Sequence, residues 1–159
     1  MTQATTVPPL VNRAMKAVLR SPLHGLVSKT VLLITFTGCK SGKPYSTPVS
    51  YSWQGDAVYI FTHATWWKNL CGGAPVTLRI RGREIQGLAE PVDGDQPVIA
   101  ARLAAHLRMV PGDAGFYQVT FDRQGNLRAE EVEKAVQTVV MVCVRPDFGR
   151  HPAGAYGEI

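Results

Sequence analysis

The chain has 159 residues, of which 45% are hydrophobic and 18% are charged, a balance typical of a globular protein with its own core. This composition excludes an intrinsically disordered chain, and no apolar run approaches the ~20 residues that span a bilayer. The formal net charge is +5, and no acidic residue precedes Asp56. A basic N-terminal third suits an anionic ligand, a membrane surface or nucleic acid, and charge alone does not choose among them.

The cysteines and histidines predict neither a disulfide framework nor a metal site. Cys39, Cys71 and Cys143 lie far apart, and no pair has the spacing of a CxxC or zinc motif. Reduced thiols and a cytoplasmic location are therefore expected, in agreement with the absence of an apolar signal-peptide core. Cys39, beside Lys40, is interpreted as an incidental rather than a catalytic thiol because no His or acid is close in sequence.

The first segment predicts an amphipathic helix that starts at Pro8 or Pro9 and ends near Ser21. Apolar residues fall on one side of this helix, and Arg13, Lys16 and Arg20 fall on the other. Such a helix either packs on the domain with its basic face in solvent or lies on a membrane surface.

Three strands are predicted next. The apolar, β-branched run 31–37 is typical of a buried strand, and 57–62 follows a Gly55 turn. Between them, residues 45–53 alternate with period two, which predicts one continuous strand. Its large side chains share one face, and the other face carries Ser46, Pro48, Ser50 and Ser52.

The remaining pattern predicts further strands interrupted by helices. We expect a short helix over 65–70, strands over 76–81 and 83–92, and a helix over 96–109 that Asp95 caps. We also expect a strand over 116–121, a helix over 129–137, a strand over 138–144, and irregular tails at 1–7 and 146–159. Together these elements predict one α+β domain over 1–159, a small, mainly β barrel with an N-terminal helix and inserted helices.

The loop 38–44 (GCKSGKP) combines two glycines with Lys40 and Lys43, so it could receive a phosphate or carboxylate through backbone N–H groups and charge. The alternative is a hairpin turn with solvated lysines. A Walker loop is excluded because the glycines are too close together and a strand follows.

Two further features favour a ligand site. The small-residue face of the strand 45–53 could hold a planar ring, although an edge strand facing solvent would carry the same residues. In the segment 66–70 (WWKNL), two adjacent tryptophans cannot both face the core, so one is expected at a surface, a pocket or an interface.

The order of these segments resembles the deazaflavin-dependent nitroreductase family, actinobacterial split β-barrel proteins related to flavin reductases and pyridoxamine-phosphate oxidases. The resemblance rests on GCKSGKP, then Thr47-Pro48, a strand, a Gly-Asp turn, another strand and WWKNL, and it covers about residues 10–92. The chain departs from the family at Cys39 and Tyr45, where arginine is common. FMN, or no cofactor, therefore stays open beside the deazaflavin.

The resemblance implies a groove for a coenzyme of the 8-hydroxy-5-deazaflavin type. The loop would hold its phosphate and acidic tail, one strand would support its ring, and two further segments would close the other side. The residues implied are Cys39, Lys40, Ser41 and Lys43 for the tail; Tyr45, Ser46, Thr47, Pro48, Val49 and Ser50 for the ring; and Phe61, Thr62, His63, Trp66, Trp67, Lys68 and Asn69 for the closing side.

The function so implied is hydride transfer from the reduced deazaflavin to a quinone, nitroaromatic or similar small electrophile. The alternative is a non-catalytic barrel that binds a flavin, fatty acid or tetrapyrrole. No catalytic residue is assigned, and Tyr51, His63 and Tyr117 are the candidates for a proton donor. Nucleic-acid binding is not expected because no known motif is present. A monomer or homodimer is expected, and peripheral membrane contact through the N-terminal helix stays open.

Overall fold

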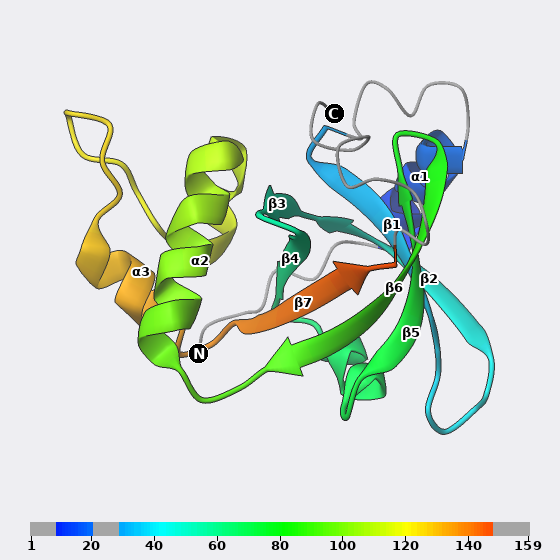
Figure 1. The fold of residues 1–159 in the computed structure, drawn as a ribbon. Helices are drawn as coiled ribbons and strands as arrows, with labels where there is room; N and C mark the ends of the chain where they lie inside the picture. Colours follow the sequence, from blue (N-terminus) through cyan, green and yellow to red (C-terminus); the bar gives the residue numbers. More distant parts are fainter. Residues whose placement is uncertain (1–8, 21–28, 148–159) are drawn as a thin grey trace.

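A computed structural model describes residues 9–20 and 29–147 (Figure 1). Its helices are α1 (Pro9–Arg20), α2 (Gln96–Met109) and α3 (Ala129–Ala135), with the 3-10 helices η2 (Thr65–Leu70) and η3 (Pro111–Tyr117). Its strands are β1 (Val31–Thr37), β2 (Pro44–Ser50), β3 (Ser52–Gln54), β4 (Ala57–Thr62), β5 (Ala74–Ile80), β6 (Arg83–Val92) and β7 (Val140–Pro146). Most of the predicted elements are confirmed. The predicted tail 1–7 lies outside the described residues, and so does the predicted tail 146–159 except for its first two residues.

The strands form one curled antiparallel sheet in the order β2-β1-β5-β6-β7-β4-β3. β2 and β3 lie at opposite edges of the sheet, yet only Tyr51 separates them in the chain. The sheet must therefore curl back on itself, as Figure 1 shows. This curled sheet with inserted helices is the α+β split barrel that the sequence predicts.

The prediction of one continuous strand over 45–53 is wrong. β2 pairs with β1, β3 pairs with β4, and the chain changes partner at Tyr51, whose N–H donates to the carbonyl of Thr30 at 3.0 Å. Tyr51 is buried in the barrel core. The alternation of large and small residues continues through the change of partner, so the periodicity gives no sign of it.

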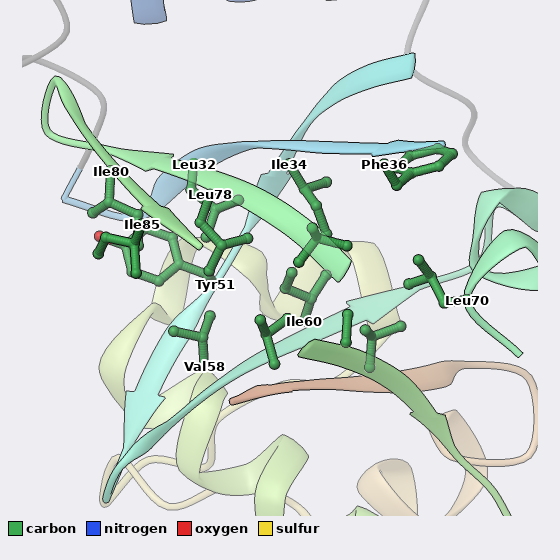
Figure 2. Packing of buried hydrophobic residues seen from close by; sticks show 14 residues of the cluster. Leu32, Ile34, Phe36, Tyr51, Val58, Ile60, Leu70, Leu78, Ile80 and Ile85 are labelled. Carbon is green, nitrogen blue, oxygen red and sulfur yellow. The ribbon is translucent and has the colours of Figure 1, made fainter. Parts of the chain in front are cut away.

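Two hydrophobic clusters form the core. The first lies inside the curl of the sheet and includes Leu32, Ile34, Ile60 and Leu78, all fully buried (Figure 2). The second lies between the sheet and the helices α2 and α3. The predicted buried faces are confirmed at Val76, Leu78 and Ile80 of β5 and at Ile99, Leu103 and Leu107 of α2.

The prediction of a strand over 116–121 is also wrong. Proline at position 111 suits the first turn of a helix, and η3 runs from there to Tyr117. The only strand-like pairing in the described part of this segment is an isolated bridge between Phe121 and Leu127. Several predicted boundaries also move: α3 ends at Ala135, the last strand begins at Val140 and includes Pro146, and β5 begins at Ala74.

The N-terminal helix α1 packs against β1 and β2. No helix of the part that the structure describes is long and apolar enough to cross a membrane.

Candidate functional site

A cavity of about 390 Å³ lies beside β2. Its walls come from β2, the end of β4, the start of η2, η3 and α1, and they are Asn12, Thr47, Pro48, Val49, Ser50, Phe61, Thr62, His63, Ala64, Trp66, Asp113, Phe116 and Tyr117. A volume of this size lies within the range of roughly 300–1,000 Å³ that is usual for small-molecule sites. Aromatic and aliphatic walls with a few polar groups suit a flat organic ligand.

Eight of the residues that the sequence implicates lie around this cavity, from Thr47 to Ser50 of β2 and at Phe61, Thr62, His63 and Trp66. Of the face of the predicted strand 45–53 that carries small side chains, only part lines the cavity. Pro48 and Ser50 line the cavity, whereas the Ser46 hydroxyl is hydrogen-bonded to Thr35 Oγ1 at 2.7 Å. Ser52 lies in β3, where its Oγ accepts a hydrogen bond from the Gln54 side chain.

The loop 38–44 is a closed turn. Gly38 donates its N–H to the carbonyl of Lys43 at 2.8 Å, and Gly42 donates its N–H to the carbonyl of Gly38 at 2.9 Å. Gly42 has a φ of 68°, a conformation that favours glycine. The glycine N–H groups are therefore committed to the turn. The backbone N–H groups of Lys40 and Ser41 donate to none of the described residues and remain available to an anion.

Asn69 joins this loop to η2. Its Oδ1 accepts a hydrogen bond from the backbone N–H of Cys39 at 3.0 Å, and its Nδ2 donates to the carbonyl of Trp66 at 2.9 Å. Both ends of one amide are thus used, so the two segments that the sequence singles out are held side by side.

Three lysines stand on these two joined segments. Lys40 and Lys43 are exposed on the loop, and Lys68 is exposed on η2. None of them forms an ion pair with a residue of the described ranges. Lys68 Nζ lies 5.9 Å from the centre of the Trp67 ring, in cation–π range. The uncompensated positive charge makes this region attractive to an anion.

An aromatic stack connects the loop with the cavity. The ring of Phe36 stacks on Tyr45 with centroids 6.2 Å apart and on Trp66 with centroids 5.5 Å apart. Trp66 lines the cavity, while Tyr45 is 47% exposed and its hydroxyl is hydrogen-bonded to Ser41 Oγ at 3.1 Å. Trp66 is thus the pocket-facing member of the tryptophan pair, and both tryptophans are partly buried.

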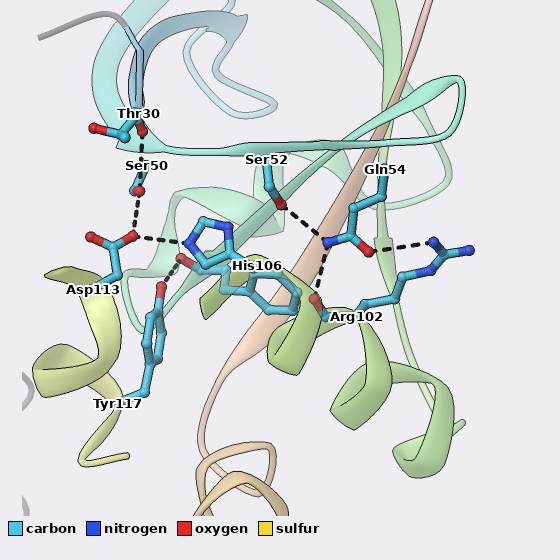
Figure 3. A network of polar contacts seen from close by, with 9 residues as sticks. Thr30, Ser50, Ser52, Gln54, Arg102, His106, Asp113 and Tyr117 are labelled. Carbon is cyan, nitrogen blue, oxygen red and sulfur yellow. Dashed lines mark hydrogen bonds and ion pairs between the residues drawn. The ribbon is translucent and has the colours of Figure 1, made fainter. Parts of the chain in front are cut away.

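Sequence reasoning missed a polar network on the cavity wall (Figure 3). Asp113 of η3 lines the cavity, and its Oδ2 contacts both His106 Nε2, at 2.9 Å, and Ser50 Oγ. Ser50 Oγ also contacts the carbonyl of Thr30 at 3.1 Å. The sequence gives little indication of this network because its residues come from three separate segments. A histidine on the apolar face of α2 is also typical of an ordinary core position.

The three proton-donor candidates differ in position. Tyr51 is buried in the first core cluster and does not line the cavity, and burial raises its pKa. Tyr117 lines the cavity but donates its hydroxyl to the carbonyl of Phe61 at 3.1 Å. Burial, with a smaller contribution from Asp113, raises the Tyr117 pKa far above its ordinary value. His63 is exposed at the cavity, with its ring 5.7 Å from that of Tyr117.

The fold and this cavity define a split β-barrel with a pocket of small-molecule size. Residues 12–131 match the family described as F420H(2)-dependent quinone reductase, and the chain belongs to that family. Its cofactor F420 is the 8-hydroxy-5-deazaflavin coenzyme, so the family and the cofactor class expected from the resemblance are confirmed. No protein of curated function matches the chain.

Solved structures are similar to this chain at low sequence identity. A structure described as an F420-H2 dependent reductase is 18% identical, over 72% of this chain and 93% of that chain, with a TM-score of 0.47. A putative pyridoxamine 5'-phosphate oxidase from Listeria innocua is 12% identical, over 79% and 93%, with a TM-score of 0.47. A structure described as a domain-swapped dimer is 16% identical, over 85% and 96%, with a TM-score of 0.50.

Proposed function

We propose that this protein transfers hydride from reduced F420 to a small electrophile such as a quinone or a nitroaromatic compound. The observation that carries the proposal is the connection made by Asn69, which joins an aromatic-walled cavity to a loop whose lysines form no ion pair with the described residues. A planar ring with an anionic tail needs these two environments next to each other.

The residues present fit such a coenzyme. Trp66 and Pro48 offer flat apolar walls for a ring, and Thr47 and Ser50 offer hydroxyl groups for its polar edge. The tail of F420 is a phosphodiester followed by glutamates, and it would meet the free N–H groups and the lysines of the loop. The loop has no guanidinium fork, so the tail would be held by point charges and backbone rather than by bidentate contacts.

The bound coenzyme supplies the hydride, and the protein supplies binding, orientation and exclusion of water. The small-residue stretch of β2 would let the ring approach the strand closely, while Trp66 and Phe116 would limit where an acceptor can lie. The cavity of about 390 Å³ would have to hold both the coenzyme ring and the acceptor. The acceptor would therefore be a compact, flat molecule stacked against the coenzyme ring.

Binding and turnover test the proposal in sequence. Purified protein is titrated with F420, with the same deazaflavin lacking its tail, and with FMN, and tryptophan fluorescence is followed. We expect quenching of Trp66 by both deazaflavins, tighter binding of the tailed form, and no saturable effect of FMN. Reduced F420 should then be oxidised by menadione only when the protein is present.

The control variant is Trp66→Phe, which keeps an aromatic wall but removes the fluorophore nearest to the cavity; it should bind F420 with a reduced signal. If the protein does not bind F420 but binds FMN, a fatty acid or a tetrapyrrole, it would instead be a carrier. Saturable F420 binding without any oxidation of the reduced form by quinones or nitroaromatics would also overturn the proposed activity.

A further inference from the structure

The network of Ser50, Asp113 and His106 reaches the cavity wall, and the proposed hydride transfer gives no role to Asp113 and His106. Asp113 and Ser50 line the cavity, whereas His106 is completely buried behind them. The His106 ring packs against Phe61, with ring centroids 5.4 Å apart. A fully buried imidazole bonded to a cavity-facing carboxyl is costly unless its protons are well placed.

Counting protons restricts how this network is charged. Ser50 Oγ has one hydrogen, but it contacts two groups that accept, the carbonyl of Thr30 and Asp113 Oδ2. The carbonyl cannot donate, so both contacts are satisfied only when Asp113 carries a proton and donates it to Ser50 Oγ. His106 then donates Nε2–H to the same carboxyl group, and each contact has one donor and one acceptor.

A neutral imidazole beside a carboxylate would leave one of the two Ser50 contacts without a hydrogen. The other charge state to compare is an imidazolium beside a carboxylate. It would place an N–H on His106 Nδ1, which has no hydrogen-bond partner among the described residues although it is buried. An unpaired buried donor is destabilising, and more so when the group is charged. With the proton on Asp113, His106 Nδ1 carries only a lone pair. A buried acceptor without a partner is less destabilising than a buried N–H of a charged ring without a partner.

We propose that Asp113 stores a proton at the cavity wall and delivers it through Ser50 to the reduced acceptor, and that His106 stabilises the carboxylate left behind. This rests on the proposed function. A quinone that receives a hydride becomes a hydroquinone anion. The Ser50 hydroxyl turns its hydrogen from the carbonyl of Thr30 to that oxygen and protonates it, while Asp113 Oδ2–H passes its proton to Ser50 Oγ. The carboxylate keeps the bond from His106 Nε2–H, and the carbonyl of Thr30 keeps the bond from the N–H of Tyr51. Solvent then returns one proton to Asp113.

The other titratable side chains around the cavity do not fill this role. Tyr117 donates to a backbone carbonyl, and burial holds its proton tightly. His63 is exposed, so solvent would compete for its proton. Asp113 is 15% exposed, which lets it face the cavity and still be replenished from solvent.

The resting charge state can be measured without a cofactor. Infrared spectra of protein labelled with ¹³C-aspartate should show, at neutral pH, the carbonyl stretch of a protonated carboxyl that Asp113→Asn removes. The matched control Asp56→Asn, in the exposed β3–β4 turn, should keep that band. Ser50→Ala should keep the band but shift it, because the acceptor of the carboxyl proton is lost. A spectrum without the band, or ¹⁵N shifts of a doubly protonated His106, would overturn the proposal.

Turnover then tests the delivery. We expect Asp113→Asn to lower kcat with menadione by about 10²-fold, the lower end of what general acids contribute, while F420 affinity stays unchanged. Added formic acid should restore part of the rate of Asp113→Asn. Ser50→Ala should also be slow, whereas Ser50→Thr, which keeps the hydroxyl, should be active.

The failures of the two proposals are distinguishable. No F420-dependent turnover by the wild type would reject the enzyme function and leave the infrared result standing. If the wild type is active, normal turnover by the Asp113→Asn variant would reject proton delivery but not the enzyme function.

Discussion

Asn69 Oδ1 accepts the backbone N–H of Cys39 at 3.0 Å, across thirty positions of sequence. The side chain that fixes the lysine loop thus belongs to the helix whose Trp66 lines the cavity. One amide thus connects the lysine loop with the cavity.

Asn69→Ala removes this connection. We expect the free energy of unfolding to fall by about 1 kcal/mol and F420 to bind several-fold more weakly, because the loop must be ordered on binding. Hydrogen exchange should accelerate over residues 38–44, and fluorescence titration gives the affinity. Thr65→Ala on the same helix should change neither quantity; equal effects of both variants would mean that Asn69 acts only on the helix.

Lys40 and Lys43 should contribute to tail binding and not to ring binding. Each exposed charge contributes about 0.2–1 kcal/mol, so Lys40→Gln and Lys43→Gln together should weaken binding of tailed F420 by up to roughly 30-fold. Added salt should reduce the difference, because exposed charges are screened. Binding of the tail-free deazaflavin should be unaffected in the double variant, and Lys134→Gln, on α3, serves as the control. Equal losses for both ligands would place the tail elsewhere.

The sequence predicts those parts of this fold and site that depend on local patterns. The run 31–37 is apolar because β1 is covered on both sides, and glycine marks the turns at Gly55 and Gly82, both with positive φ. The change of strand partner at Tyr51 depends on distant strands. The contact of Ser50 with Asp113 joins positions sixty-three apart, and no local pattern indicates it.

The contact of Glu131 with Thr120 makes stability depend on pH at the edge of α3. Glu131 Oε2 accepts from Thr120 Oγ1 at 2.8 Å and from Thr120 N at 2.6 Å, and these bonds lower the pKa of Glu131 below 4.5. A lowered folded-state pKa adds stability above pH 4.5, and this stability is lost as the pH falls through the folded-state pKa. Glu131→Gln should lower Tm at neutral pH, and the difference should shrink in acid. Glu133→Gln, on the same helix, removes a carboxylate but leaves both bonds of Glu131 intact, so it serves as the control.

Gly38 and Tyr45 should be coupled, because a Cβ at position 38 would lie 2.6 Å from Tyr45 Cε2 and 2.7 Å from Ser41 Oγ. Gly38→Ala must therefore displace the Tyr45 ring and break its hydrogen bond with Ser41. We expect a cost of about 1 kcal/mol in the free energy of unfolding, at the low end for overpacking because Tyr45 is half exposed and can move. In a Tyr45→Ala background the same substitution should cost clearly less, because only the contact with Ser41 Oγ remains and Gly38 has no positive φ. Gly115→Ala, which meets no atom within 4 Å, is the control. A denaturant double-mutant cycle measures the coupling, and additive costs would show that the clash is relieved without Tyr45.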